Sequence, residues 1–192
     1  MIGVMSLYGV GTAVRAETPD SIEAVRDAVS SVSYVPAMPS GVPASAQLWE
    51  HAVNSLIKTV GAAATKQVQA SDIFYEARRA GIEPNLLLAL VEILSRYDAR
   101  HNSSDRNFGL LQIDPAIQNR LGNPENSLLQ AKYNLRLGSI LFRHYLDLNK
   151  GNINLALSRF LTEASPQQAP EAKVQDVLAL RLVRAKALPS TE

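Results

Sequence analysis

The sequence contains no cysteine, which excludes disulfide bonds, thiolate metal sites, a cysteine nucleophile and a lipidated N-terminal cysteine. An excess of either charge is also lacking. The net charge is +1, so composition gives no argument for nucleic acid or an acidic membrane surface as a partner. No apolar run is long enough to cross a bilayer. The three histidines, His51, His101 and His144, lack metal-ligand spacing, and we expect neither a metal nor a cofactor.

The first part of the sequence suggests export followed by a tether. Residues 1–16 are predicted to be a signal peptide, because the stretch from Ile2 to Val14 is apolar and small residues precede Glu17. No Lys or Arg precedes this stretch, so a plain apolar N-terminal segment is the alternative. Residues 17–45 are predicted to form a short helix and then a proline-rich linker.

The rest of the sequence predicts a mainly α fold, with a domain over residues 46–169 and a C-terminal helix and tail over 170–192. Apolar residues recur at helical spacing, and no segment is rich in β-formers. Further helices are predicted over 126–147, 152–163 and 170–187. The apolar face predicted for the first helix of the domain consists of Leu48, Trp49, Ala52, Val53, Leu56 and Val60, and that of the last helix of Val174, Val177, Leu178, Leu182 and Ala185.

The centre of the domain carries clear helix signals. The apolar positions Ile73, Phe74, Ala77 and Ala80 precede Gly81, which is predicted to end that helix. Pro84 then suits the first position of the next helix, where a missing N–H costs nothing. Residues 86–94 are apolar nearly all round, which is typical of a buried central helix.

Two short sequence motifs follow this central helix. The sequence Gly-Leu-Leu-Gln-Ile spans residues 109–113, and Asn-Leu-Arg-Leu-Gly spans residues 134–138. Together with residues 80–89 they resemble the lytic transglycosylases of the soluble lysozyme-like type, which cut bacterial peptidoglycan. The resemblance covers roughly residues 70–165. It implies a lysozyme-like domain in the periplasm that has peptidoglycan strands or envelope-complex proteins as partners, and the second motif is nearest to enzymes that accompany conjugation and secretion systems.

The sequence departs from this family where the chemistry takes place. The family carries its catalytic glutamate at the position of Leu94, and a tyrosine and an asparagine at the positions of Phe160 and Leu161. Cleavage needs a carboxylic acid with a raised pKa that protonates the leaving oxygen. In this family the same glutamate later acts as the base, so the resemblance supplies no second carboxylate. A leucine can neither donate nor accept a proton, and no catalytic residue is therefore assigned.

Two other carboxylates are alternative acids. Glu92 lies two residues before Leu94, about 200° away around a helix, so we expect it to point away from the groove as a solvated or locally paired carboxylate. Glu163 falls where the family has a glycine, and it either approaches the site from the opposite wall or sits at a helix end. Asp98 is predicted to have a structural role in a turn.

Two polar residues of the family groove are retained. Ser95 corresponds to the serine beside the family's acid, and Gln112 to the glutamine that lines its cleft, so both are candidate substrate-binding residues. Each also has a structural interpretation, because a serine near a helix end and a buried glutamine can both satisfy backbone groups.

The sequence therefore favours a non-catalytic transglycosylase-like domain that binds peptidoglycan or serves as a structural part of an envelope assembly. The alternative is an active transglycosylase that cleaves the MurNAc–GlcNAc β-1,4 bond with a displaced acid, Glu92 or Glu163. A helical adaptor unrelated to sugars is a third interpretation.

Overall fold

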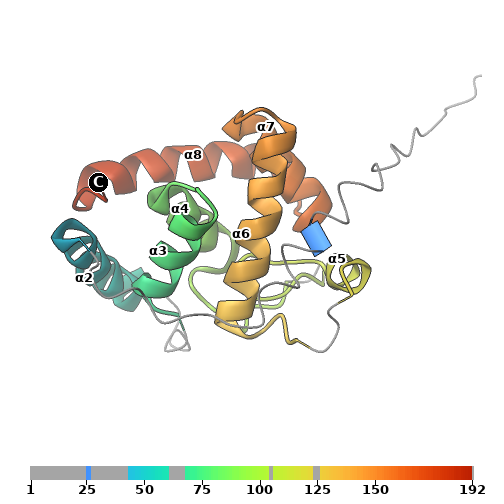
Figure 1. Ribbon diagram of the computed structural model, residues 1–192, viewed down its shortest axis with the longest axis horizontal. Helices are drawn as coiled ribbons and strands as arrows, with labels where there is room; N and C mark the ends of the chain where they lie inside the picture. The colour runs from blue at the N-terminus through green and yellow to red at the C-terminus, as the bar shows by residue number, and fades with distance from the viewer. Residues whose placement is uncertain (1–24, 27–42, 61–67, 104–105, 123–125, 192) are drawn as a thin grey trace, which may run out of the picture.

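The computed structural model of the protein describes residues 25–26, 43–60, 68–103, 106–122 and 126–191 (Figure 1). The predicted signal peptide, and nearly all of the predicted short helix and linker, lie outside these residues. Every regular element within them is a helix, which confirms the mainly α prediction. In chain order the helices are α2 (Ala44–Val60), α3 (Ala70–Arg79), α4 (Pro84–Ser95), α5 (Pro115–Arg120), α6 (Ala131–Leu148), α7 (Ile153–Arg159), the π-helix η2 (Phe160–Ala164) and α8 (Pro170–Ala187).

Helix α4 is the centre of the fold. Its residues from Leu86 to Val91 are each at most 2% exposed, and α8 lies across it (Figure 1). As predicted, Pro84 stands in the first turn of α4. Gly81, with φ +64, follows the end of α3, where the amide of Ile82 donates to the carbonyl of Ala77 at 2.8 Å. This is the bond pattern of a glycine-terminated helix.

The buried faces of the first and last helices differ from the prediction. Leu48 of α2 is 62% exposed. The residues of α2 that are buried in the core lie on a neighbouring stripe of the helix and are Ala46, Trp49, Val53 and Ile57. Leu182 of α8 is 58% exposed, and Ala185 is also exposed. Arginines from the other side of α8 reach α4 instead, as described below.

Two helix boundaries also differ from the prediction. Helix α6 begins at Ala131, not at 126, because the carbonyl of Leu128 accepts a hydrogen bond from the Asn134 side chain at 3.0 Å instead of from a helical amide. The helix predicted over 152–163 changes type at Phe160. From there it is a π-helix, in which the amide of Ser165 donates to the carbonyl of Phe160 at 2.8 Å.

Candidate functional site

The position that the sequence assigns to the family's acid is apolar and enclosed. Leu94 is 5% exposed and belongs to the hydrophobic core. The neighbouring Ser95 is also buried, and its hydroxyl donates to the carbonyl of Val91 at 3.0 Å. The end of α4 is shaped by two left-handed residues, Arg96 with φ 50 and Tyr97 with φ 65. Such conformations are uncommon for residues with a Cβ, and the full burial of Tyr97 holds the chain there.

Glu92 is engaged on another side of α4. Its carboxylate accepts from two guanidinium nitrogens of Arg184 in α8, Nη2 at 2.5 Å and Nε at 3.1 Å. The hydroxyl of Tyr97 donates to the same carboxylate at 2.6 Å. The Glu92 side chain is 12% exposed and that of Arg184 is 15% exposed. Burial, and then the bond to Glu92, raise the pKa of the Tyr97 hydroxyl, so the hydroxyl stays a donor.

The segment that would carry the family's tyrosine and asparagine is packed into the core. Phe160 is 0% exposed and its ring meets those of Phe142 and Tyr145 edge to face, with centroids 5.9 and 6.4 Å apart. Leu161 is also 0% exposed. Glu163 points outward, with 39% of its side chain exposed, and its nearest cationic atom is Nε of Arg159 at 3.9 Å.

The Gly-Leu-Leu-Gln-Ile segment forms a tight, buried turn. The backbones of Phe108 and Ile113 exchange two hydrogen bonds of 3.1 and 3.0 Å. Gln112 is fully buried and has a φ of 50. Its Nε2 donates to the carbonyls of Gly109 at 2.7 Å and His101 at 3.1 Å. Its Oε1 is buried without a hydrogen-bond partner, so the amide retains one unused acceptor.

The second retained motif anchors this turn. Asn134, which is 0% exposed, accepts from the amide of Leu111 at 2.7 Å and donates to the carbonyls of Phe108 at 2.9 Å and Leu128 at 3.0 Å. One helical turn further on, a Cβ on Gly138 would lie 2.3 Å from a methyl carbon of Leu111. Sequence reasoning missed these roles. The spacing of four residues, which puts Asn134 and Gly138 on one face of α6, was the available signal.

Close approach also explains the glycine of the first motif. Gly109 has φ +78, and a Cβ there would stand 2.3 Å from the carbonyl oxygen of Leu128 and 2.4 Å from Nδ2 of Asn134. The two motifs therefore fit each other atom by atom. In this chain they fix the position of a loop on α6, and this function is independent of any catalytic acid.

A buried charge cluster joins α3 to α6. Nε of Arg136 lies 2.8 Å from both carboxylate oxygens of Glu76, and Arg79 binds the same carboxylate at 2.8 Å. Glu76 and Arg136 are 2% and 4% exposed. The guanidinium of Arg136 also lies over the ring of Tyr75, 5.9 Å from its centroid. This cluster fixes the packing of α3 on α6, which carries Asn134.

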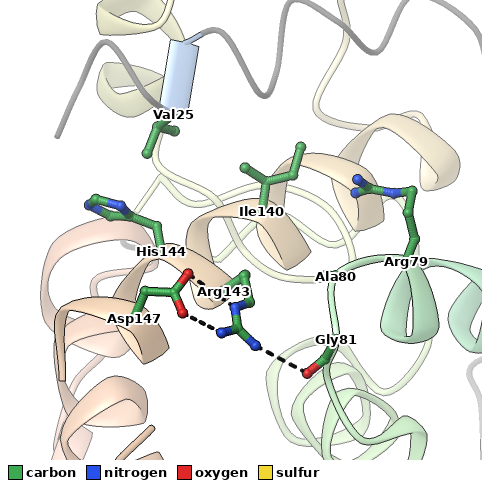
Figure 2. A pocket seen from close by; sticks show the side chains of 8 residues that line it. All are labelled: Val25, Arg79, Ala80, Gly81, Ile140, Arg143, His144 and Asp147. Atoms are coloured by element: carbon green, nitrogen blue, oxygen red, sulfur yellow. Dashed lines mark hydrogen bonds and ion pairs between the residues drawn. The ribbon is translucent and has the colours of Figure 1, made fainter. Parts of the chain in front are cut away.

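A cavity of about 530 Å³ lies between the end of α3 and α6 (Figure 2). Figure 2 shows Val25 over the α6 side of it, and Arg143 placed between Asp147 and the carbonyl of Gly81. Neither Leu94 nor Gln112 lines this cavity. Within the described residues no group of acidic, histidine or cysteine side chains could hold a metal ion.

Comparison with known families agrees with this geometry. Residues 71–160 match the family model described as the Transglycosylase SLT domain. This part of the chain is therefore a lytic transglycosylase-like domain, and its fold is of the lysozyme-like kind. No curated protein matches the chain. The family implies a function related to peptidoglycan, and hence a place outside the cytoplasm. In the described part of the chain, no helix is long and apolar enough to cross a membrane.

Proposed function

We propose that the protein is a non-catalytic lytic transglycosylase-like domain that acts in the periplasm as a peptidoglycan-binding or structural component of an envelope assembly, such as a secretion or conjugation system. The observation that carries the proposal is the joint burial of Leu94, Phe160 and Leu161, each at most 5% exposed. An apolar group at each of the three positions leaves no proton donor where the family has one.

The environments of the two alternative acids support the same proposal. Glu92 accepts hydrogen bonds from Arg184 and Tyr97, so its carboxylate is held in the contact between α4 and α8. A general acid must instead be placed within hydrogen-bond reach of the leaving oxygen of the substrate. Glu163 points outward, with 39% of its side chain exposed, and lies near Arg159, so it is not enclosed in a pocket that could hold a sugar.

Glycan binding by the retained residues is part of the proposal. The Oε1 of Gln112 has no hydrogen-bond partner, and it is the acceptor that we propose for a sugar hydroxyl. Because Gln112 is fully buried, this contact requires the turn to move. The hydroxyl of Ser95 is bonded to Val91 and keeps its acceptor lone pairs. We therefore expect Gln112→Leu to weaken binding to insoluble peptidoglycan more than Ser95→Ala does, measured by co-sedimentation of the full chain.

Product analysis tests the absence of catalysis. The full chain is incubated with purified peptidoglycan, and soluble anhydro-muropeptides are measured by mass spectrometry. We expect none. Product from the unmodified chain that disappears in Glu92→Gln or in Glu163→Gln would establish the active-enzyme alternative and end this proposal.

Restoring the acid tests whether the groove still accepts a glycan strand. Leu94→Glu supplies a carboxylic acid at this position, and Leu94→Gln is its matched control of similar shape without an acidic proton. Since the family also uses the residues that Phe160 and Leu161 replace, the triple variant Leu94→Glu/Phe160→Tyr/Leu161→Asn is tested beside it. Anhydro-muropeptides from the glutamate variants alone support a glycan-binding groove. If no variant cleaves and the unmodified chain does not sediment with peptidoglycan, the role is protein binding, and the glycan part of the proposal is wrong.

A further inference from the structure

Helix α8 carries apolar residues on two opposite sides. The side that faces α4 includes Val174 and Val177, which are at most 5% exposed. On the other side Leu182 is 58% exposed and Val183 is 54% exposed. A helix on the outside of a domain ordinarily presents polar residues to water, and one that is apolar all round is ordinarily covered.

The exposed residues form one continuous stripe. With 100° between successive residues of a helix, the members of this stripe lie within about 120° of one another, centred on Ala179. They lie directly opposite the residues that contact α4, among them Arg181 and Arg184. We call these exposed residues the α8 stripe: Ala172, Gln175, Asp176, Ala179, Leu182, Val183 and Lys186.

The charges on the α8 stripe are separated along its length. Asp176 lies toward the N-terminal end and Lys186 toward the C-terminal end, with Ala179, Leu182 and Val183 between them. Neither charged residue forms an ion pair with another described residue. A parallel copy of the helix would bring like charges together, which is unfavourable. An antiparallel copy would bring opposite charges together.

We propose that the α8 stripe binds the α8 stripe of a second copy of this chain, antiparallel and around a two-fold axis close to Leu182. In this arrangement Asp176 meets Lys186 of the second copy and Ala179 meets Val183. The axis then passes at the level of residue 181, and the two Leu182 side chains lie beside it. Because each contact occurs twice in a two-fold interface, the dimer gains two ion pairs. The small side chain of Ala179 leaves room for the opposing valine.

The size of the stripe sets the strength of the dimer. From Ala172 to Lys186 it runs about 21 Å along the helix, and one helix face of this length covers less than the ~800 Å² per partner of a standard stable interface. The dimer is therefore reversible, and it dissociates on dilution. High salt weakens it, because the exposed ion pairs at its rim are screened.

A charge-exchange experiment tests the pairing. The oligomeric state of the full chain is measured by sedimentation velocity over a series of concentrations. Asp176→Lys places like charges at both ends of the interface, and so does Lys186→Asp. The dimerisation of each variant alone should therefore be at least about tenfold weaker than that of the unmodified chain. An equimolar mixture of these two variants brings opposite charges together again and should form dimers as strongly as the unmodified chain.

The apolar centre is tested by Leu182→Gln, with Leu48→Gln as its matched control. Both leucines are exposed, but Leu48 lies on α2, away from the stripe. Dimerisation should be lost in the first variant and unchanged in the second, while thermal unfolding of both stays close to that of the unmodified chain. A chain that is monomeric at every concentration overturns the proposal. So does a mixture of the two charge variants that fails to restore dimers, or a dimer that persists in Leu182→Gln.

Discussion

Arg184 of α8 binds the carboxylate of Glu92 in α4, 92 residues earlier in the chain, through two hydrogen bonds. A second arginine of α8, Arg181, pairs with Glu83 at the start of α4. The last helix is thus attached to both ends of the central helix. The side chain of Glu92, one of the two alternative acids that the sequence offers, is used in this attachment.

Removal of the Arg184 guanidinium should destabilise the fold. Arg184→Met keeps most of the apolar stem and leaves the Glu92 carboxylate, only 12% exposed, with the Tyr97 hydroxyl alone. Hydrogen bonds to charged groups contribute about 1.5–3 kcal/mol, and we expect a loss of that size in the free energy of unfolding, measured with urea. The double variant Glu92→Leu/Arg184→Met leaves no unpaired charge and should lose less than the two single variants combined. Simple additivity would mean that the pair contributes nothing.

Gly109→Ala should be much more damaging than the same change at Gly151. The two glycines have nearly equal φ values, +78 and +79, so the backbone strain of about 1 kcal/mol is common to both. Only at Gly109 does the added Cβ meet other atoms, 2.3 Å from the Leu128 carbonyl, whereas at Gly151 nothing lies within 4 Å. We expect Gly109→Ala to lose at least about 2 kcal/mol more in urea unfolding. Equal losses would show that the turn does not fit against Asn134 as described.

Local signals in the sequence identify the end of α3 and the start of α4, because a glycine after a helix or a proline in its first turn acts on the few residues around it. They do not identify the π-helix at Phe160, since its bond pattern depends on packing against α6. The same dependence on tertiary packing explains why Leu182 is exposed although the sequence predicts it to face the core. Helical periodicity places it on an apolar face, but α8 has two such faces, and the choice between them depends on Glu83 and Glu92, distant residues that bind its arginines.

The resemblance of the sequence to transglycosylases predicts the fold, and the match of residues 71–160 to the Transglycosylase SLT domain confirms a domain of this kind over that part of the chain. It does not reveal what the retained motifs do in this chain. When only the sequence is considered, Gln112 is a residue of the family's cleft and Asn134 is part of the second retained motif. In the structure each binds backbone groups of the same loop, which is a packing relationship that depends on three-dimensional contacts.

Glu50 should make stability depend on pH. Burial, and then the nearby charge of Asp72, raise the pKa of the Glu50 carboxyl group above its usual value of 4.5, and its Oε1 is buried without a hydrogen-bond partner. A raised pKa in the folded state means that the protonated form stabilises the fold below pH 4.5. This contribution disappears as the pH rises through the folded-state pKa.

Glu50→Gln should therefore have a higher Tm than the unmodified chain at pH 7, and the difference should vanish below pH 4.5. Differential scanning calorimetry across this range measures it. Glu163→Gln is the matched control, because that side chain is 39% exposed, and it should change Tm little at either pH. A Glu50→Gln variant that is less stable at pH 7 would show that the carboxylate has a favourable partner.

The buried pair of Arg136 and Glu76 should be the most sensitive charged contact in the domain. Arg136→Met keeps a long apolar side chain but leaves Glu76, 2% exposed, with only Arg79 to neutralise it. Breaking a buried pair by removing one partner typically costs about 3–5 kcal/mol, a large part of the total stability of a domain. We expect a loss of this size in urea unfolding.

The double variant Glu76→Met/Arg136→Met removes both buried charges, and Arg79, whose side chain is 28% exposed, can turn to water. The double variant should then recover most of the loss, because an apolar pair of similar volume replaces a buried ion pair at little cost. If the double variant is as unstable as Arg136→Met, the loss comes from packing against Tyr75 and not from the unpaired carboxylate.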